Sequence, residues 1–366
     1  MIQDEITLND LKKMPKESYV LVDMRGSVAF SHGHIPHAVS IPVDQLEEQV
    51  WKNENVIIYC SIGEQSREVV RHLREKGVNA CNLKGGFREW LMEEERLLDK
   101  DELDRYSRQI ILPEVGIEGQ KKLKNARVLI VGAGGLGSPA ALYLGAAGIG
   151  TIGIADGDVV SMSNLHRQIV HDTASVGLSK VESAKCRLEA INPHIQVITY
   201  QMPVTADNIG DIIKDYDFII DGADNFQTKF LINDACVIAG KPFCHAGILR
   251  FDGQVMTWVP GKRPCYRCIF EDIPEGDSIP NCASAGIIGA MAGVIGSFQA
   301  LEAVKYILGI GELLTGRMLI VDGLTMRCRI AEFREPSKEC RVCGEHPVIR
   351  DVREWKEYYT IPGCRL

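Results

Sequence analysis

A glycine-rich turn between a predicted strand and a predicted helix constrains the fold of this chain more than any other segment. Residues 127–131 (RVLIV) form an apolar run, the turn GAGGLG follows with Gly132, Gly134 and Gly137, and a helix is predicted over residues 138–147. Asp156 ends the next predicted strand. Such a turn lets backbone N–H groups at a helix N-terminus approach a phosphate, while the carboxylate accepts from ribose hydroxyls. The pattern predicts a mostly parallel sheet with a nucleotide at this turn, and a tight turn without a ligand is the alternative.

The nucleotide is either NAD or ATP. Hydride transfer needs a pocket beside the cofactor, whereas nucleotidyl transfer needs cations around the phosphates and a carboxylate for magnesium. The predicted strand ends carry the second set: Asn164 and Arg167 lie in SNLHRQ, Lys180 ends VGLSK, and Asp224 and Asn225 follow YDFIID. Ligands bind beyond the carboxyl ends of strands in such folds. The pattern favours ATP and leaves an NAD-dependent oxidoreductase as the alternative.

Six segments together carry a family resemblance. They are RYSRQI at residues 105–110, VGAGGLGS, DGDVVSMSNLHRQ, VGLSKVESA, INPHI and DGADN. In combination they resemble the ubiquitin-activating-enzyme-like adenylyltransferases of the ThiF, MoeB and HesA group, which activate sulfur-carrier proteins in thiamine and molybdopterin biosynthesis. The resemblance spans residues 104–345.

The resemblance implies an ATP site with magnesium, shared between the two subunits of a homodimer. It implies that Asp224 holds the magnesium ion, that Arg167 acts on the phosphates, and that Arg108 reaches the ATP of the neighbouring subunit. The residues that it places at ATP are Arg108, Gly132, Gly134, Gly135, Gly137, Asp156, Asp158, Asn164, Arg167, Lys180, Asp224 and Asn225.

Two CxxC pairs predict a metal site. Cys265 and Cys268 form the first pair, and Cys340 and Cys343 form the second. Four thiolates suit a tetrahedral zinc ion, and the long gap between the pairs means that the ion would pin the C-terminal segment to the domain. The family resemblance implies a structural zinc at these positions. Redox-active pairs and inert buried thiols are the alternatives.

The N-terminal region contains a candidate sulfur-carrying cysteine. Cys60 ends the predicted strand NVIIYC, and the loop SIGEQS then leads into a predicted helix, so backbone N–H groups can surround a thiolate. With VDMR at 22–25, GHIPHA at 33–38 and KGGFREW at 84–90, this region resembles a rhodanese domain, whose cysteine carries a persulfide.

The Cys60 loop departs from the usual CxxGxRS pattern of that family. Gln65 replaces the arginine, while Gly63 and Ser66 are kept. Without that cation, anionic donors such as thiosulfate fit less well than a persulfide-donating protein such as a cysteine desulfurase. A docking module without catalysis is the alternative. A phosphatase loop is disfavoured, because Arg67 stands one position beyond C-x5-R.

Cys282, in PNCASAG, precedes a long glycine-rich predicted helix, whose N-terminus would favour a thiolate. It aligns with a reactive cysteine position in the adenylyltransferase family. A packed, unreactive thiol is the alternative at this position.

Length and composition predict two α/β domains. We expect a rhodanese-like domain over residues 1–92, a charged helical linker over 93–103, and a Rossmann-like, doubly wound domain with a four-cysteine zinc site over 104–366. The uncharged stretch 283–301 is interrupted by polar residues and predicts a buried helix, not a membrane span. A net charge of -8 gives no footprint for nucleic acid, and 12 cysteines without a leader segment predict a cytoplasmic protein with free thiols.

Together these features predict an enzyme that adenylates the C-terminal glycine of a ubiquitin-like sulfur carrier ending in Gly-Gly and then installs sulfur as a thiocarboxylate. A persulfide on Cys60 would attack the acyl adenylate. Cys282 would either cleave the resulting acyl disulfide or accept the acyl group first. A scaffold that binds ATP and a carrier, and regulates another sulfurtransferase, is the non-enzymatic alternative.

Overall fold

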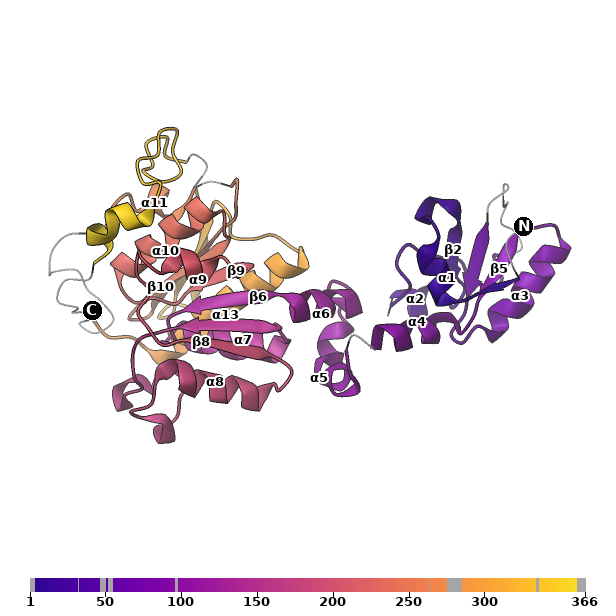
Figure 1. The fold of residues 1–366 in the computed structure, drawn as a ribbon, viewed down its shortest axis with the longest axis horizontal. Coiled ribbons are helices and arrows are strands. Elements are labelled where there is room, and N and C mark those ends of the chain that lie inside the picture. The colour runs from indigo at the N-terminus through magenta and orange to yellow at the C-terminus, as the bar shows by residue number, and fades with distance from the viewer. Residues whose placement is uncertain are drawn as a thin grey trace. The chain divides into compact units, whose positions relative to one another are not determined.

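The computed structural model describes residues 4–31, 33–46, 51, 55–95, 98–262, 264–274, 285–333 and 336–360. The chain divides into two compact units, residues 1–121 and 122–366. The division falls within one helix, α6 (Gly116–Asn125). Each unit has its own sheet and hydrophobic core (Figure 1).

The smaller unit is built on a five-stranded sheet in which every neighbouring pair is parallel. Its middle strands are short apolar runs buried along nearly their whole length, as strands covered on both faces require. The strand order is β1-β5-β4-β2-β3, with bounds β1 Glu5–Ile6, β2 Val20–Asp23, β3 Val39–Ser40, β4 Val56–Tyr59 and β5 Ala80–Leu83.

Helices surround this sheet and continue into the segment that follows it. Helix α5 begins with a capping box, in which Asp99 accepts from the backbone N–H of Glu102 and the Glu102 side chain accepts from Asp99. The helices are α1 Leu8–Lys13, α2 Ser27–Ser31, α3 Glu64–Glu75, α4 Gly86–Glu95, α5 Lys100–Ile110 and α6, with a 3-10 turn over Lys16–Ser18.

The larger unit contains an eight-stranded sheet with the order β13-β12-β11-β10-β9-β6-β7-β8. The five strands from β10 to β8 are parallel, as predicted, whereas β11, β12 and β13 are antiparallel additions at one edge. The bounds are β6 Arg127–Val131, β7 Thr151–Ala155, β8 Gln196–Tyr200, β9 Phe218–Asp221, β10 Phe243–Leu249, β11 Asp252–Trp258, β12 Arg317–Asp322 and β13 Arg327–Glu332.

The order of the parallel strands reverses between β6 and β9. From β6 the chain moves outward to β7 and β8, and it then returns to place β9 and β10 on the other side of β6. Ligands bind at such a switch point. The helices are α7 Gly137–Ala147, α8 Lys180–Ile191, α9 Ile209–Ile213, α10 Phe226–Ala239, α11 Tyr266–Ile269 and α13 Gly289–Leu308, with 3-10 turns over Met162–Asn164, Thr173–Ser175 and Val352–Tyr359.

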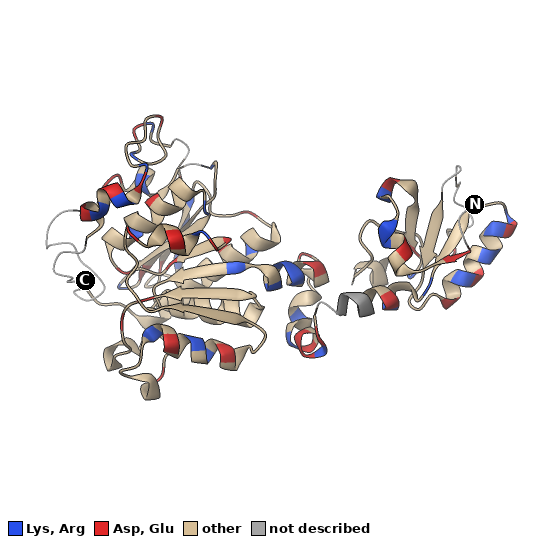
Figure 2. Cartoon of the chain, in the orientation of Figure 1, with Lys and Arg blue, Asp and Glu red and all other residues tan. Residues whose placement is uncertain are grey.

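Helix α13 covers part of the predicted uncharged stretch and is a core helix, as expected. It packs against α7 and against β9, β10 and β11, and it buries Met291, Ala292 and Ile295. Among the residues that the structure describes, no helix combines the length and apolar character needed to cross a membrane. Charged side chains gather on the helices and connecting segments, and the strands carry few of them (Figure 2).

Candidate functional site

The glycine turn lies at the switch point, between the end of β6 and the start of α7. Gly132 has a φ of +99°, which L side chains rarely adopt. A side chain on Gly137 would collide with the carbonyl of Gly132, so the first turn of α7 lies directly against the loop. The unpaired N–H groups of this helix N-terminus are available to a phosphate.

Asp156 joins the glycine turn to a lysine. Its Oδ2 accepts from the backbone N–H of Ala133 at 2.8 Å, and its Oδ1 accepts from the N–H of Asp158 at 2.8 Å. Lys180, which is buried at the start of α8, places Nζ 2.7 Å from Asp158 Oδ2 and 3.8 Å from Asp156 Oδ2. Three of the predicted nucleotide-binding residues therefore meet beside the turn.

Arg167 lies against the same turn. Its side-chain carbons stand 3.6 Å from the position that a Cβ on Gly135 would occupy, and its guanidinium donates to the Ser163 carbonyl at 3.0 Å. Asn164 is less directly placed, because its side chain accepts from the Ser161 N–H and closes its own 3-10 turn.

His171 is a contact residue of the turn that our sequence analysis missed. Its Nε2 lies 3.0 Å from the Ala133 carbonyl and must donate to it, so Nδ1 accepts from the Ser183 hydroxyl at 2.9 Å. Burial lowers the pKa of His171, which keeps the ring neutral. The sequence alone shows only a histidine four residues after Arg167, which does not reveal this contact.

Asp224 stands on the turn that follows β9. Its side chain is exposed, and within the described ranges its carboxylate has neither a hydrogen bond nor an ion pair. Asn225 caps α10 by accepting from the N–H of Thr228 at 2.8 Å. A Cβ on Gly132 would stand 2.7 Å from the Gly222 carbonyl, so the Asp224 turn touches the glycine turn. A free carboxylate oxygen at this place suits a hard cation such as magnesium.

A buried ionic network closes the end of β9, and our sequence analysis did not identify it. Asp221, the last residue of β9, accepts from Lys229 Nζ at 3.2 Å and from His245 Nδ1 at 2.6 Å. Burial acts to raise the pKa of Asp221, but the Lys229 charge and the His245 hydrogen bond outweigh it and the pKa is lowered. The signal in the sequence was a polar residue in each of two otherwise mostly apolar strands, Asp221 in β9 and His245 in β10.

The predictions for Arg108 and Cys282 are not tested at this site. Arg108 is exposed on α5, in the unit formed by residues 1–121. Cys282 lies outside the described residues, so its role stays a prediction.

Cys60 lies in the smaller unit, directly after β4 and before α3. Its Sγ accepts from the backbone N–H of Gly63 at 3.1 Å and from the Ser66 hydroxyl at 3.4 Å. Burial acts to raise the pKa of Cys60, but these donors and the N–H groups of Ile62 and Ser66 outweigh it, so the pKa is lowered. The predicted cradle of donors around a thiolate is present.

The cradle is held in place by its neighbours. The Cys60 carbonyl accepts from the N–H of Phe87 at 2.9 Å, and a side chain on Gly86 would collide with that carbonyl. Asn82 accepts from the Ser66 hydroxyl at 2.7 Å and thereby orients it. Gln65 is exposed at the start of α3.

The two CxxC pairs form one cluster in the larger unit. The Sγ atoms of Cys265, Cys268, Cys340 and Cys343 all lie within 4.8 Å of one another. The separations include 3.8 Å for Cys265–Cys268, 3.7 Å for Cys265–Cys340 and 3.3 Å for Cys268–Cys343. Zinc–sulfur bonds of about 2.3 Å give a tetrahedral edge of about 3.8 Å, so the four thiols fit a zinc ion.

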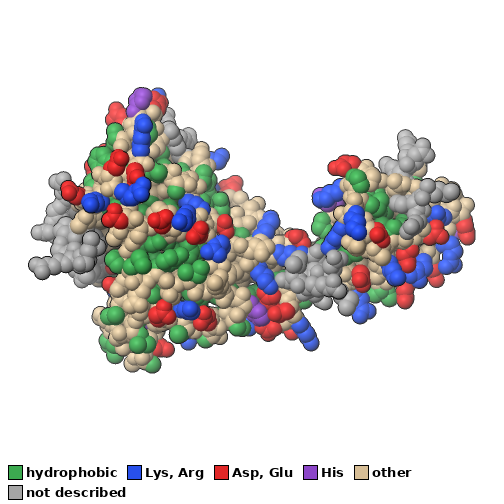
Figure 3. Space-filling model, viewed as in Figure 1, with side chains coloured by type: hydrophobic (Ala, Val, Ile, Leu, Met, Phe, Trp, Pro, Cys, Tyr) green, Lys and Arg blue, Asp and Glu red, His purple; other side chains and the backbone are tan. Residues whose placement is uncertain are grey.

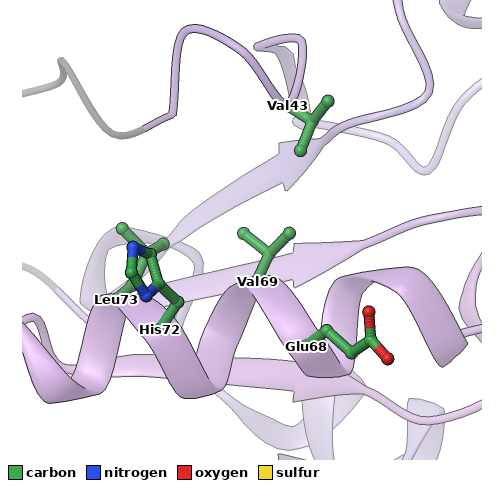
Figure 4. Close-up of a pocket in the computed structure, with 5 residues that line it drawn as sticks. All are labelled: Val43, Glu68, Val69, His72 and Leu73. Carbon is green, nitrogen blue, oxygen red and sulfur yellow. The ribbon is translucent and has the colours of Figure 1, made fainter.

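The described residues also line two shallow openings that contain no predicted nucleotide-binding residue. One has a volume of about 240 Å³ and lies between α3 and Val43, and its lining on α3 consists of Glu68, Val69, His72 and Leu73 (Figure 4). The other, of about 450 Å³, lies beside the cysteine cluster and is lined by Trp258, Gly261, Lys262, Val342, Cys343 and Gly344.

Comparisons with known proteins match both units. Residues 106–342 match the ThiF family, and residues 7–93 match the rhodanese-like domain. A protein of Aedes aegypti named adenylyltransferase and sulfurtransferase MOCS3 is 44% identical over 264 residues, which are 72% of this chain and 60% of that protein. Its counterpart in Culex quinquefasciatus is 41% identical over 295 residues, which are 81% of this chain and 67% of that protein.

The chain thus spans about three-fifths to two-thirds of the length of these relatives. A similar solved structure is that of E. coli MccB with ATP, with 25% identity and a TM-score of 0.58, covering 68% of this chain and 76% of that chain.

Proposed function

This chain belongs to the ThiF family and carries a rhodanese-like domain, and on that premise we propose that it uses ATP to adenylate a ubiquitin-like sulfur carrier ending in Gly-Gly. The activated carboxylate then receives sulfur and becomes a thiocarboxylate. The names of the MOCS3 relatives support both activities.

One observation carries the proposal. At the switch point, two cations, Arg167 and Lys180, lie beside a glycine turn, and the Asp224 carboxylate next to it has no partner within the part of the chain that the structure describes. Phosphoryl chemistry needs this combination, whereas hydride transfer to a nicotinamide does not. The solved MccB structure with ATP is a further support, since it shares the fold.

The residues divide the work of adenylation. An oxygen of the carrier carboxylate attacks the α-phosphorus of ATP, an acyl phosphate bond forms, and the bond to pyrophosphate breaks. Lys180 and Arg167 neutralise the charge that develops on the departing pyrophosphate, and Arg108 of a partner subunit adds a third cation. Asp224 would hold magnesium, which would shield the negative charge of the phosphates. Gly132, Gly134, Gly135 and Gly137 admit the phosphates, and Asp156, Asp158, Asn164 and Asn225 complete the nucleotide site.

Sulfur enters at Cys60. A thiolate there accepts a sulfur atom from a persulfide donor such as a cysteine desulfurase, and the cradle that lowers the thiol pKa also stabilises the resulting persulfide anion. The terminal sulfur attacks the acyl carbon and releases AMP. Cys282 then attacks Sγ of Cys60 and releases the thiocarboxylate, leaving a disulfide for a cellular thiol to reduce, or it accepts the acyl group before the sulfur arrives.

Dimerisation is supported by an exposed apolar face. Helices α7 and α13 pack together, and their outer sides expose Tyr143, Val294 and Leu301. On the visible face of the larger unit, apolar side chains likewise gather among mixed charges (Figure 3). None of the described cysteines forms a disulfide, and we place the homodimer in the cytoplasm, where cysteines stay reduced.

Pyrophosphate exchange tests the adenylation step. With ATP, magnesium and a panel of Gly-Gly-ending carriers, we expect exchange with one of them and its loss in Asp224→Ala. Asp211→Ala, which removes an exposed carboxylate on α9, is the matched control and keeps the wild-type rate. Wild-type exchange in Asp224→Ala, or tight NAD binding that displaces ATP, would contradict the proposal.

Gln65 supports a second candidate, in which the rhodanese-like domain only docks a partner. The Cys60→Ala variant separates the two. We expect it to keep pyrophosphate exchange but to lose thiocarboxylate, which the mass of the carrier shows as a missing gain of about 16 Da, sulfur replacing oxygen. Cys81→Ala removes a buried thiol whose pKa burial raises to about 12, and it is the matched control. Normal thiocarboxylate formation by Cys60→Ala would establish the docking role.

A further inference from the structure

The end of β9 is fastened by three elements that meet at Asp221. This carboxylate is fully buried, and His245 is its register partner on the neighbouring parallel strand β10 (Figure 1). Lys229, from α10, donates both to Asp221 and to the Ala246 carbonyl, the latter at 2.6 Å. Gln299, from α13, donates to the Asp221 carbonyl at 2.8 Å and to the Cys244 carbonyl at 2.9 Å.

The His245 ring makes only one of its two hydrogen bonds within the described structure. Its Nδ1 donates to Asp221, and its Nε2 is buried without a partner. Burial and the nearby Lys229 charge lower the pKa of His245, so the ring is neutral and Nε2 carries an unused lone pair. Burying such a group is unfavourable, and an apolar residue would fill the site without that cost. The hydrogen bond that Nδ1 donates to Asp221 therefore explains why a histidine occupies this buried position.

Asp221 in turn holds the segment that leads to Asp224. Its Oδ1 accepts from the Ala223 N–H at 3.0 Å, which fixes the first bend after β9. At the same bend Gly222 packs against Gly132, so the bend sets the position of the Asp224 segment relative to the glycine turn. Asp224, one residue beyond Ala223, carries the carboxylate that has no partner among the described residues.

We propose that His245 is a positioning residue for the divalent cation of the adenylation site: it holds Asp221, which fixes the bend that places Asp224. This inference rests on the proposed function for the identity of the reaction, but its geometry depends only on Asp224 and the nucleotide turn. Residues behind a metal ligand typically tune metal affinity by about 10- to 100-fold.

Manganese binding in the presence of ATP tests the role without a carrier protein. We expect His245→Leu to weaken Mn²⁺ binding, followed by electron paramagnetic resonance, by about tenfold or more, with ATP affinity in the absence of metal unchanged within about twofold. Cys244→Ala, an equally buried change on the same strand, is the matched control and keeps the wild-type affinity. In the pyrophosphate exchange assay, we expect His245→Leu to need a correspondingly higher magnesium concentration for its half-maximal rate.

An amide pair keeps the test decisive if His245→Leu does not fold. Asparagine places its N–H near the position of Nδ1, whereas glutamine places it near Nε2, so His245→Asn retains metal affinity and His245→Gln loses it. Wild-type Mn²⁺ affinity in a folded His245→Leu or His245→Gln protein with normal zinc content would overturn the inference. The proposed function would instead be refuted if His245→Leu loses Mn²⁺ affinity as expected but the wild-type chain exchanges pyrophosphate with none of the carriers in the panel.

Discussion

Replacing Arg267 by methionine isolates the contribution of a buried ion pair to the metal-binding half of the larger unit. Arg267 lies on α11, between the predicted zinc ligands Cys265 and Cys268 in the sequence. Its guanidinium contacts both oxygens of Asp234 on α10, at 2.6 and 3.1 Å. The side chains are 1% and 0% exposed, so Arg267→Met leaves a carboxylate in the core without its cation.

The size of the effect follows from that burial. Removing one partner of a buried pair costs about 3–5 kcal/mol, because the other charge stays uncompensated. In a unit of about 250 residues each kcal/mol lowers the melting temperature by about 2–4 °C, so we expect a loss of about 6–20 °C. The Tyr359 hydroxyl and the Asn233 amide still donate to Asp234, at 2.6 and 2.7 Å. We therefore expect a loss of melting temperature towards the smaller end of that range.

The loss of stability in Arg267→Met is expected to depend on pH. Burial raises the pKa of Asp234, and Arg267 acts against that rise, so the variant has a still higher folded pKa. A carboxyl with a raised folded pKa takes up its proton in the folded state first, and it therefore favours folding as the pH falls. The difference in stability between the variant and the parent should shrink as the pH falls from 7 towards 4.

Calorimetry with parallel metal analysis measures both effects. Arg353→Met, which breaks the exposed pair with Asp351, is the control and leaves the melting temperature nearly unchanged. A drop below about 2 °C for Arg267→Met at pH 7, or a deficit that grows on acidification, would refute the argument from burial.

Two further predictions concern the metal and the shared site. Purified protein should contain one zinc per chain, and Cys265→Ser should lose the metal and melt at a lower temperature; metal-free protein prepared without chelators would contradict this. Arg108→Ala and Asp224→Ala chains should each be inactive dimers, and mixing them should restore about a quarter of wild-type activity, because half of the exchanged dimers are mixed and each has one intact site of two. An active monomer would rule out the shared site.

Local patterns predicted the parts of the fold that depend on local chemistry. The run RVLIV and the glycines after it predicted β6, the turn and α7, because a buried parallel strand and a helix N-terminus both leave short-range signatures. The cysteine cluster was predicted from ligand number, since two CxxC pairs supply a complete tetrahedral set. The antiparallel edge strands β11 and β13 were not anticipated, because the alternation of strands with helices predicts parallel pairing only.

Long-range register explains what the sequence did not reveal. His245 meets Asp221 because β10 lies beside β9 in one particular register, and a shift of one residue would turn the imidazole to the other face. His171 reaches the glycine turn through a hydrogen bond to the Ala133 carbonyl, which no spacing rule specifies. Polar residues buried by tertiary contacts of this kind are visible in a sequence only as exceptions to an apolar pattern.

The two units share one backbone arrangement, a strand, a glycine-containing turn and a helix, but place different side chains around it. In each, a buried parallel strand ends in a turn that contains a glycine with positive φ, Gly63 or Gly132, and a helix of at least 11 residues follows. The free N–H groups there favour negative charge. Around Cys60 the turn and the start of α3 direct donors at the sulfur, at 3.1 and 3.4 Å. Around Gly132 the cations Arg167 and Lys180 lie beside the turn, as a polyphosphate requires. The first arrangement therefore suits a persulfide and the second suits ATP, and this difference supports assigning sulfur transfer and adenylation to separate units.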